Sequence, residues 1–585
     1  MSNDTDACLP APVKDIVFDL HDSVRRSQVA TEQSVFLATF RDLSSKYFDK
    51  TAWPSPQSVS SECGGDALFL ALYKELTLRH LHSVTRPDVR ARIDGWHVYR
   101  GLFDFLLAEA PSSESGEDGK EDRGQKQDPF YIVPEWAFDI LHEFVYQFQG
   151  FCQFRTSTYA NALKHASSAA ASGEGGSGGK QPPHHVIEAL DVLSQNRDAW
   201  AVETVLFYLH RLISVGSASN SPPAYKYMAL FASVTLSRLE CLLGDYRASL
   251  AALSYVYSGD VVAVGGELPA SAPGAENKTL EEIMMSVFPA RLSVSYHAGV
   301  SYLMLRRYKD AASVLGSICS YMQRGFKTGQ LRNIPGSEQF TKLFERMTAL
   351  LAILTHVCPT TGIVDDSVLR AVRDKHGHQL SKIEAGEEGY EDLFIFACPK
   401  FVSPAVPDYG QATTSAAAAA ASSAGGAGGS GGPTGQDAYK LQVGQFMNEM
   451  SQQQTLRKLR SYMKLYTSIS VGKLAAFNDT NEEEFLPLLL CYKHKMRQLE
   501  KKKSSSDDDL DDNDDEDNGG DKNDDEVAPL DGTIGTALDI HYYIVNDMVH
   551  VDEAEKQRRF ENYFMAQIAQ NEEIMQEVDA ILTGA

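Results

Sequence analysis

Residues 455–500 constrain the fold most, because they predict three short helices in succession. Apolar residues recur at helical spacing until the sequence SIS interrupts them. Ser470 stands where it can cap a second short helix. Thr480 and Glu483 have the spacing of a capping box, which predicts the start of a third helix. Pro487 falls inside this third helix, so we expect the helix either to start at Pro487 or to kink there.

Beyond an acidic interruption, the segment HYYIVNDMVHV (541–551) predicts a β-hairpin. Its two β-rich runs flank Asn546-Asp547, a pair typical of two-residue hairpin turns. Three short helices followed by a hairpin have the layout of a winged-helix module. Such modules often bind duplex grooves, so the basic residues of the first and third helices are candidate RNA contacts. They are Arg457, Lys458, Arg460, Lys464, Lys493, Lys495 and Arg497. The alternative is a solvated face, because basic side chains are favoured near a helix C-terminus.

The residues before this module predict a largely helical body. Segments 225–253 and 288–315 share one pattern, in which a helix, a short polar break and a tyrosine precede a second helix. Tyr246 and Tyr308 each precede a leucine by seven residues, as expected for tetratricopeptide-type helical hairpins. We therefore expect a mainly α fold, in which a TPR-like helical-repeat superhelix is followed by a winged-helix module and a long C-terminal helix.

Three other segments carry specific expectations. Residues 134–155 have aromatic side chains on more than one face, which indicates a helix buried on several sides. The Gly/Pro/Ala-rich stretch 259–277 is interpreted as a loop between the two repeats. Residues 391–409 are punctuated by proline and are expected to be extended and to lie over the repeats.

The C-terminal residues 553–582 predict an amphipathic helix. Its apolar stripe would be longer than a small winged helix can cover, so part of it should pack on a partner helix. The stripe consists of Phe560, Phe564, Ile568, Met575, Val578 and Leu582.

The formal net charge of −25 is unevenly distributed along the chain. Residues 504–526 hold thirteen Asp and Glu against one Lys, whereas residues 455–503 hold eleven Lys and Arg against five Asp and Glu. We expect the acidic tract to be disordered and to screen part of the basic residues beside it.

The sequence shows no residues arranged for catalysis, cofactor binding or metal binding. The Gly-rich tracts lack the Lys-Ser/Thr ending and the preceding strand of a phosphate loop. His142-Glu143 begins like a metalloprotease motif, but Tyr146 stands where the second histidine belongs. The eight cysteines are scattered singly, which indicates reduced intracellular thiols. We see neither a secretory signal nor an apolar run long enough to span a membrane.

These patterns predict six regions in order. They are an N-terminal helical segment (1–50), a helical-repeat region (51–258) with insertions at 111–128 and 167–183, TPR-like helices (283–410), a low-complexity linker (411–436), a winged helix (437–552) with an acidic insertion at 504–530, and a C-terminal bundling helix (553–585).

Several blocks resemble the subunit L family of eukaryotic translation initiation factor 3, and they occur in family order over about residues 45–580. The blocks are FLALYKELTLRHLHSV, DILHEFVYQFQGFCQFR, LLGDYRASLAAL, YLMLRRYKDAASVL, LFIFACPKFVSPAVPDY, SYMKLYTSISVGKLAAF, YKHKM and VNDMVHV. The resemblance implies a PCI architecture, in which helical repeats lead into a winged helix. The acidic tract and the Gly/Ser/Ala-rich insertions depart from the family pattern.

The resemblance also implies a function. Members are non-catalytic, cytoplasmic scaffold subunits that support assembly of the 43S pre-initiation complex and recruitment of mRNA and initiator tRNA to the 40S ribosome. The implied neighbours are subunits K and E, which would contact the winged helix laterally and bundle with the C-terminal helix. On this chain the lateral edge would be the hairpin, with Tyr543, Val545, Val549 and Val551. A PCI subunit of the proteasome lid or signalosome, and a winged-helix RNA-binding protein, remain alternatives.

Overall fold

The structure is a computed structural model that describes residues 10–110, 129–171, 183–218, 221–264, 276–332, 336–358, 362–385, 389–409, 437–500, 529–536, 540–553, 568 and 575. Contacts divide the chain into two compact units. The first comprises residues 1–356, 360–448 and 500–533, and the second comprises residues 357–359, 449–499 and 534–585. The predicted insertion 111–128, the linker 411–436 and most of the acidic insertion lie outside the described residues. The predicted regional boundaries stay predictions.

The first unit is built almost entirely of helices, and its strands are short. Its N-terminal helices are α1 (Ala11–Arg25), α2 (Ser27–Ala30), α3 (Gln33–Tyr47), α4 (Pro56–Val59), α5 (Ala67–Val84) and α6 (Val89–Ala108). The helices that follow in this unit include α7 (Pro134–Ala171), α8 (His184–Gln195), α9 (Val202–Gly216), α15 (Ser337–Val357) and α16 (Asp366–Ala385).

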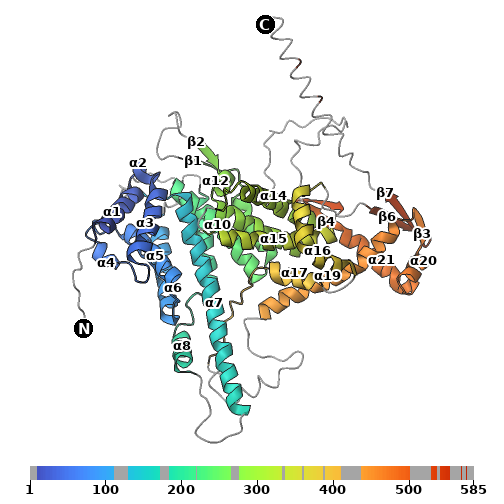
Figure 1. The fold of residues 1–585 in the computed structure, drawn as a ribbon, viewed down its shortest axis with the longest axis horizontal. Helices are drawn as coiled ribbons and strands as arrows, with labels where there is room; N and C mark the ends of the chain where they lie inside the picture. Colours follow the sequence, from blue (N-terminus) through green and yellow to red (C-terminus); the bar gives the residue numbers. More distant parts are fainter. Residues whose placement is uncertain are drawn as a thin grey trace, which may run out of the picture. The chain divides into compact units, whose positions relative to one another are not determined.

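Helix α7 lies alongside α10 (Pro223–Leu243), and aromatic residues form much of its buried surface (Figure 1). Trp136, Phe138, Phe144, Phe148 and Phe151 are buried, whereas Tyr146 is exposed, so the helix is buried on several sides. Helix α7 continues to Ala171, so the first residues of the predicted insertion 167–183 are helical.

Two helical hairpins confirm the repeat-like part of the predicted fold class. The first is α10 with α11 (Tyr246–Ala252) and a short 3₁₀ turn, and the second is α13 (Phe288–Met304) with α14 (Tyr308–Lys327). Tyr246 and Tyr308 begin the second helix of each hairpin and are both buried. The residue two positions earlier is left-handed in each turn, with φ of +90° at Gly244 and +64° at Arg306. The two turns therefore have the same backbone conformation at this position, although one has glycine there and the other arginine.

Two predicted coil segments are partly wrong. Within 259–277, the strands β1 (Val261–Val264) and β2 (Glu276–Thr279) pair antiparallel, since the β-branched run VVAV favours a strand. Within 391–409, the first residues belong to α17 (Gly389–Ala397). The remainder carries no helix or strand and packs on the repeats, where the Val402 N–H donates to the Leu242 carbonyl at 2.9 Å.

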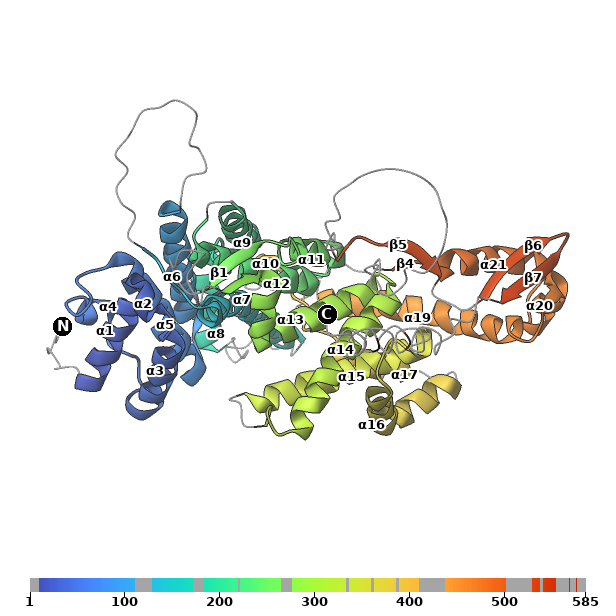
Figure 2. The same cartoon turned by 90° about the horizontal axis from the view of Figure 1, so that it is seen from above.

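The second unit contains the predicted winged helix (Figure 2). In chain order its elements are the C-terminal part of α19 (Asp437–Met463), β3 (Ser468–Ser470), α20 (Val471–Phe477), α21 (Glu482–Met496), β6 (Ile540–Val545) and β7 (Met548–Glu553). The three strands lie in the order β3-β7-β6, all antiparallel. Strands β4 (Arg497–Glu500) and β5 (Thr533–Thr536) form a separate two-stranded sheet.

Local sequence signals explain most of this module. Ser470 caps α20, since its hydroxyl accepts from the Lys473 N–H at 3.3 Å. The hairpin turns at Asn546 and Asp547 with φ of +46° and +59°, as a type I′ turn requires. The predicted capping box of the third helix is wrong. The Thr480 N–H and hydroxyl instead bond the Ala475 carbonyl, which closes the end of α20.

A single apolar core joins these elements. It consists of Leu459, Met463, Ile469, Val471, Leu474, Ala475, Phe485, Leu489, Tyr492, Tyr542 and Val549. Tyr542 ties the wing to the third helix, because its hydroxyl donates to the Leu489 carbonyl at 2.5 Å and its ring stacks on Tyr492.

Candidate docking surface of the winged helix

The third helix, α21, presents two exposed leucines beside its buried face. Phe485, Leu489 and Tyr492 enter the core, whereas Leu486 is 39% exposed and Leu490 is 56% exposed. Positions four apart lie on one face of a helix, so the two leucines form a continuous exposed stripe. A helix that binds a duplex groove requires polar or basic side chains at such positions.

Pro487 lies beside this stripe and is exposed. The helix begins at Glu482 and passes through Pro487, so the alternative of a helix starting at Pro487 is wrong. Proline lacks the N–H that would bond the carbonyl of Glu483. The helix therefore has one fewer internal hydrogen bond in the same turn that presents the exposed leucines.

The wing presents a second surface. Strand β6 pairs only with β7 among the described strands, so its other side is a sheet edge. Tyr543 and Val545 alternate with core residues along β6 and are 45% and 48% exposed. The Tyr543 ring stacks on His550 of β7, with ring centroids 5.2 Å apart. An edge strand with exposed apolar side chains can pair with a strand of another chain.

The other predicted interface residues divide into two groups. Val549 is fully buried in the core and Val551 packs against it. Both residues therefore support the wing from inside, and neither is exposed as Tyr543 is. In the C-terminal segment, Ile568 and Met575 are helical and exposed, at 51% and 62%. Phe560, Phe564, Val578 and Leu582 lie outside the described residues.

The candidate RNA contacts do not all face solvent. Lys495 pairs with Glu449 at 2.9 Å and also donates to Gln452, and the Lys493 ammonium lies 5.7 Å from the centre of the Tyr542 ring. Lys464 and Arg497 are exposed.

Arg460 is half-buried beside Tyr492. Burial raises the pKa of that tyrosine, and Arg460 opposes the rise. The side chains of Arg457 and Lys458 lie outside the described residues, although both positions belong to α19.

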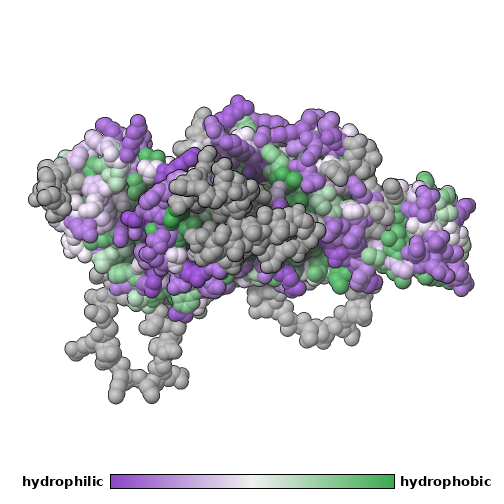
Figure 3. Space-filling model, turned by 90° about the horizontal axis from the view of Figure 1, so that it is seen from below, coloured by the Kyte–Doolittle hydropathy of each residue, from purple (hydrophilic) through white to green (hydrophobic). Residues whose placement is uncertain are grey.

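Sequence reasoning missed Leu486 and Leu490. The run Phe485–Leu490 is apolar throughout, so its sequence does not separate the buried residues from Leu486 and Leu490, which flank the buried face. The available signal was an apolar pair four residues apart on the face that an amphipathic helix should leave polar. Single exposed apolar residues also occur among polar ones elsewhere, as on the face in Figure 3. The four-residue spacing of Leu486 and Leu490 is therefore stronger evidence for a contact surface than their exposure alone.

Two buried ionisable groups in the first unit, Glu75 and His142, each lie against another ionisable side chain. Glu75 has no exposed surface and accepts from the Tyr99 hydroxyl at 3.0 Å. His142 lies 3.0 Å from the Arg238 guanidinium, and burial together with this cation holds the pKa of His142 well below its usual value. Among the described residues, no group of three His, Cys, Asp or Glu is placed to hold a metal ion. No described helix is both long and apolar enough to cross a membrane.

Comparison with known proteins shows which family this chain resembles. Residues 91–571 match the family model described as RNA polymerase I-associated factor PAF67, a range that includes the helical hairpins and the winged helix. Similar curated proteins are named eukaryotic translation initiation factor 3 subunit L. The one from Nematostella vectensis is 28% identical over 594 residues, covering 98% of this chain and 94% of that protein. Those from Gallus gallus and Homo sapiens are each 29% identical over 565 residues, covering 93% of this chain and 82% of theirs.

The chain belongs to the family of eukaryotic translation initiation factor 3 subunit L. It is therefore a translation initiation factor subunit, as the resemblance of its sequence blocks implied. The proteasome-lid and signalosome alternatives are excluded by the same comparison, because these relatives are named as initiation factor subunits. The mainly α structure, with helical hairpins and a winged helix, agrees with the architecture expected for the subunit L family.

Proposed function

We propose that this chain is a non-catalytic scaffold subunit of initiation factor 3 in the cytoplasm. It holds other subunits by protein–protein contacts, and so supports assembly of the 43S pre-initiation complex and recruitment of mRNA and initiator tRNA to the 40S ribosome. The family match over residues 91–571 is the observation that carries this proposal. Subunits K and E are the proposed neighbours.

The lateral contact is proposed at the edge of β6. A neighbouring winged helix can continue the sheet there, because backbone groups of an edge strand lack a second strand partner. Tyr543 and Val545 would supply the apolar contact beside these hydrogen bonds. The exposed stripe of Leu486 and Leu490 gives the same module a second apolar contact area. Ile568 and Met575 support a separate contact of the C-terminal helix with partner helices.

Co-purification tests both the function and the surface. A tagged chain is purified from cells of its source, and the accompanying proteins and 40S particles are quantified. The double variant Tyr543→Asp/Val545→Asp places two charges at the edge, and we expect more than about tenfold loss of the neighbouring subunit. Phe18→Asp is the control, because Phe18 is comparably exposed but lies on α1 of the first unit.

The two parts of the proposal fail differently. A wild-type chain that brings down no other factor 3 subunit and no 40S particle contradicts the function. A double variant that retains every subunit contradicts the β6 edge alone. Equal loss in the Phe18→Asp control would show that any surface charge disrupts the chain.

RNA binding by the winged helix is the second candidate, supported by the exposed Lys464 and Arg497. It predicts that the full chain binds single-stranded RNA with an affinity that falls steeply with salt. The double variant Lys464→Glu/Arg497→Glu should then weaken binding at low salt, measured by fluorescence anisotropy. Deleting residues 504–526 should strengthen it, since this removes thirteen acidic residues next to the basic segment. No binding of the wild-type chain at low salt rules this candidate out.

A further inference from the structure

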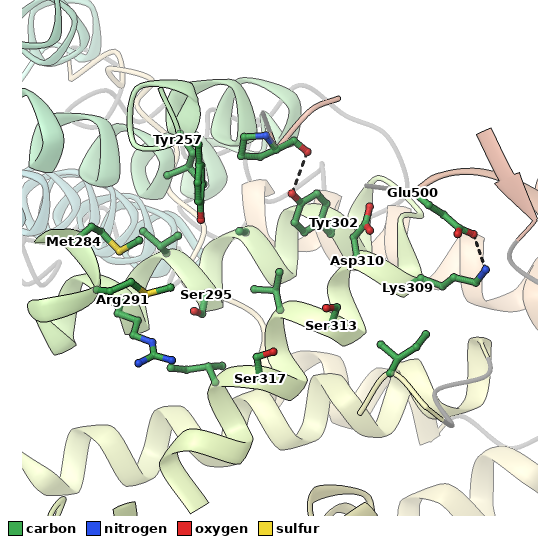
Figure 4. A pocket seen from close by; sticks show the side chains of 18 of the residues that line it. Tyr257, Met284, Arg291, Ser295, Tyr302, Lys309, Asp310, Ser313, Ser317 and Glu500 are labelled. Atoms are coloured by element: carbon green, nitrogen blue, oxygen red, sulfur yellow. Dashed lines mark hydrogen bonds and ion pairs between the residues drawn. The ribbon is translucent and has the colours of Figure 1, made fainter. Parts of the chain in front are cut away.

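The second helical hairpin forms one side of an open groove in the first unit (Figure 4). Its volume is about 690 Å³, within the range of sites that hold small molecules or short peptides. Both helices of the hairpin, α13 and α14, line the groove. Helix α12 (Leu280–Ser286) adds Met284 and Met285 to the lining. The floor is mostly apolar, with Val294, Ala298 and Ile318 among its residues.

One end of the groove already holds an extended piece of this chain. The Tyr302 hydroxyl donates to the Pro529 carbonyl at 3.0 Å. The Arg307 guanidinium donates to the carbonyls of Pro529, Leu530 and Asp531 at 2.9, 3.0 and 3.1 Å. Three successive carbonyls bound in this way amount to recognition of main chain, which does not depend on side-chain identity. Residues 529–531, at the end of the predicted acidic insertion 504–530, are thus held by these hydrogen bonds.

Arg307 is itself held in place for this role. Its side chain is 4% exposed, and its Nε donates to Asp310 at 2.7 Å. Beside it, Lys309 pairs with Glu500 at 2.7 Å, so a residue shortly before the acidic insertion is bound at the same end of the groove (Figure 4). The cations at this end are therefore engaged with groups of the chain itself.

The opposite end of the groove presents a different cation. The Arg291 guanidinium lies 4.3 Å from the centre of the Tyr321 ring, and no carboxylate in the described part of the chain pairs with it. Arg291 and Tyr302 are eleven residues apart on α13, which corresponds to about 16 Å along the helix. An extended peptide covers that distance with about five residues. The hydroxyls of Ser295, Ser313 and Ser317 line the path between them (Figure 4).

We propose that this groove is a binding site for an extended acidic peptide and that its occupant is residues 524–528 of this chain. Counting back five residues from Pro529 leads to Asp524, followed by Asp525 and Glu526. This order brings the carboxylates to Arg291 at the far end. Val527 and Ala528 then fall on the apolar floor next to the bound carbonyls.

Attachment to the bound segment favours this occupant over a free peptide. Because Pro529 is already fixed at the groove, residues 524–528 have an effective concentration in the millimolar range without any further association cost. Any partner peptide that uses the groove must displace them. The acidic insertion is then more than a solvated loop, since its last residues are a ligand for the helical repeat. This inference is independent of the proposed scaffold function.

Hydrogen exchange of the full-length chain, read by mass spectrometry, tests the proposal. We expect the amides of residues 524–528 to exchange about tenfold more slowly than those of residues 507–512 in the same tract. Arg291→Glu should abolish that difference, and so should the triple variant Asp524→Asn/Asp525→Asn/Glu526→Gln. The matched control, Asp507→Asn/Asp508→Asn/Asp509→Asn, removes the same charge away from the bound end and should keep the protection.

The exchange of residues 529–531 and the thermal midpoint check that the variants remain folded, because Arg307 holds these residues without Arg291. Equal exchange over 507–512 and 524–528 in the wild-type chain would overturn the proposal. Protection that survives Arg291→Glu would also overturn it. If the faces of α13 and α14 become protected only in the purified multi-subunit complex, a partner peptide is the occupant and the proposed occupant is wrong.

Discussion

Replacing Glu143 by glutamine tests how a buried carboxyl group limits the stability of the first unit. Glu143 lies on α7 and accepts a hydrogen bond from Gln147, one turn later, at 3.1 Å. Burial raises the pKa of Glu143 to about 7, and the nearby Glu75 carboxylate adds to the rise. Gln147, Arg79 and Arg238 oppose it without cancelling it. At neutral pH and above, the native chain therefore holds a charged group in a poorly solvated place.

The sign of the pH dependence follows from the two pKa values. In the unfolded chain Glu143 titrates near its ordinary 4.5, and in the native chain near about 7. The native state thus binds the proton more tightly, so stability falls as pH rises through this window and stays lowered above it. The shift in pKa lowers the free energy of unfolding by roughly 3 kcal/mol above pH 7 and leaves it unchanged well below pH 4.5. Glutamine cannot ionise, and it keeps an oxygen that accepts from Gln147.

Differential scanning fluorimetry of the full chain measures the effect. At about pH 8 we expect Glu143→Gln to raise the thermal midpoint by a few degrees, because roughly 3 kcal/mol is spread over a large unit. At about pH 5 the difference should fall to roughly a quarter of its value at pH 8. Glu483→Gln, a change at an exposed position of α21, should shift neither midpoint. Equal midpoints at pH 8, or the same increase at both pH values, would refute the reasoning.

Two further substitutions test packing and a single hydrogen bond. A Cβ at Gly299 would lie 2.6 Å from a methyl of Leu315, so Gly299→Ala should destabilise by about 1–2 kcal/mol after the gain from replacing a helical glycine. A Cβ at Gly101 would have no heavy atom within 4 Å, so Gly101→Ala should stabilise the fold by about 0.5–1 kcal/mol. Shifts of the thermal midpoint in the same direction for the two variants would contradict this reasoning. Tyr542→Phe removes the bond to the Leu489 carbonyl and should destabilise the winged helix by about 1 kcal/mol. Faster amide exchange in α21 checks this effect, and unchanged exchange would argue against it.

The winged helix could be predicted because its signals are local. A capping serine, an Asn-Asp turn and apolar spacing each act over a few residues, and all three are found in the structure. The capping box failed for a reason that spacing does not contain. Thr480 could bond either the start of α21 or the end of α20, and its hydroxyl donates to the Ala475 carbonyl at the end of α20. Competition between neighbouring elements for one side chain is settled by the three-dimensional path of the chain.

The groove of the second hairpin could not be predicted in this way. It depends on Arg307 meeting carbonyls more than 200 residues later in the chain. A buried arginine that binds main chain leaves no mark on the residues it binds, since any residue offers a carbonyl. The repeat pattern predicted the tyrosine that begins α14 but not the role of the arginine just before it.

The charge count of the winged helix shows the same limit and changes how the module is interpreted. Residues 455–503 carry a net charge of +6, which suggests affinity for nucleic acid. In the folded module, however, Lys495 pairs with Glu449 and Lys493 lies over the Tyr542 ring. The third helix also carries an exposed stripe of two leucines, Leu486 and Leu490. A groove-binding helix cannot place leucines against phosphates and base edges without leaving polar groups of the nucleic acid unpaired. The same stripe suits an apolar protein surface, so the helix that would bind nucleic acid in other winged helices is better suited here to another subunit.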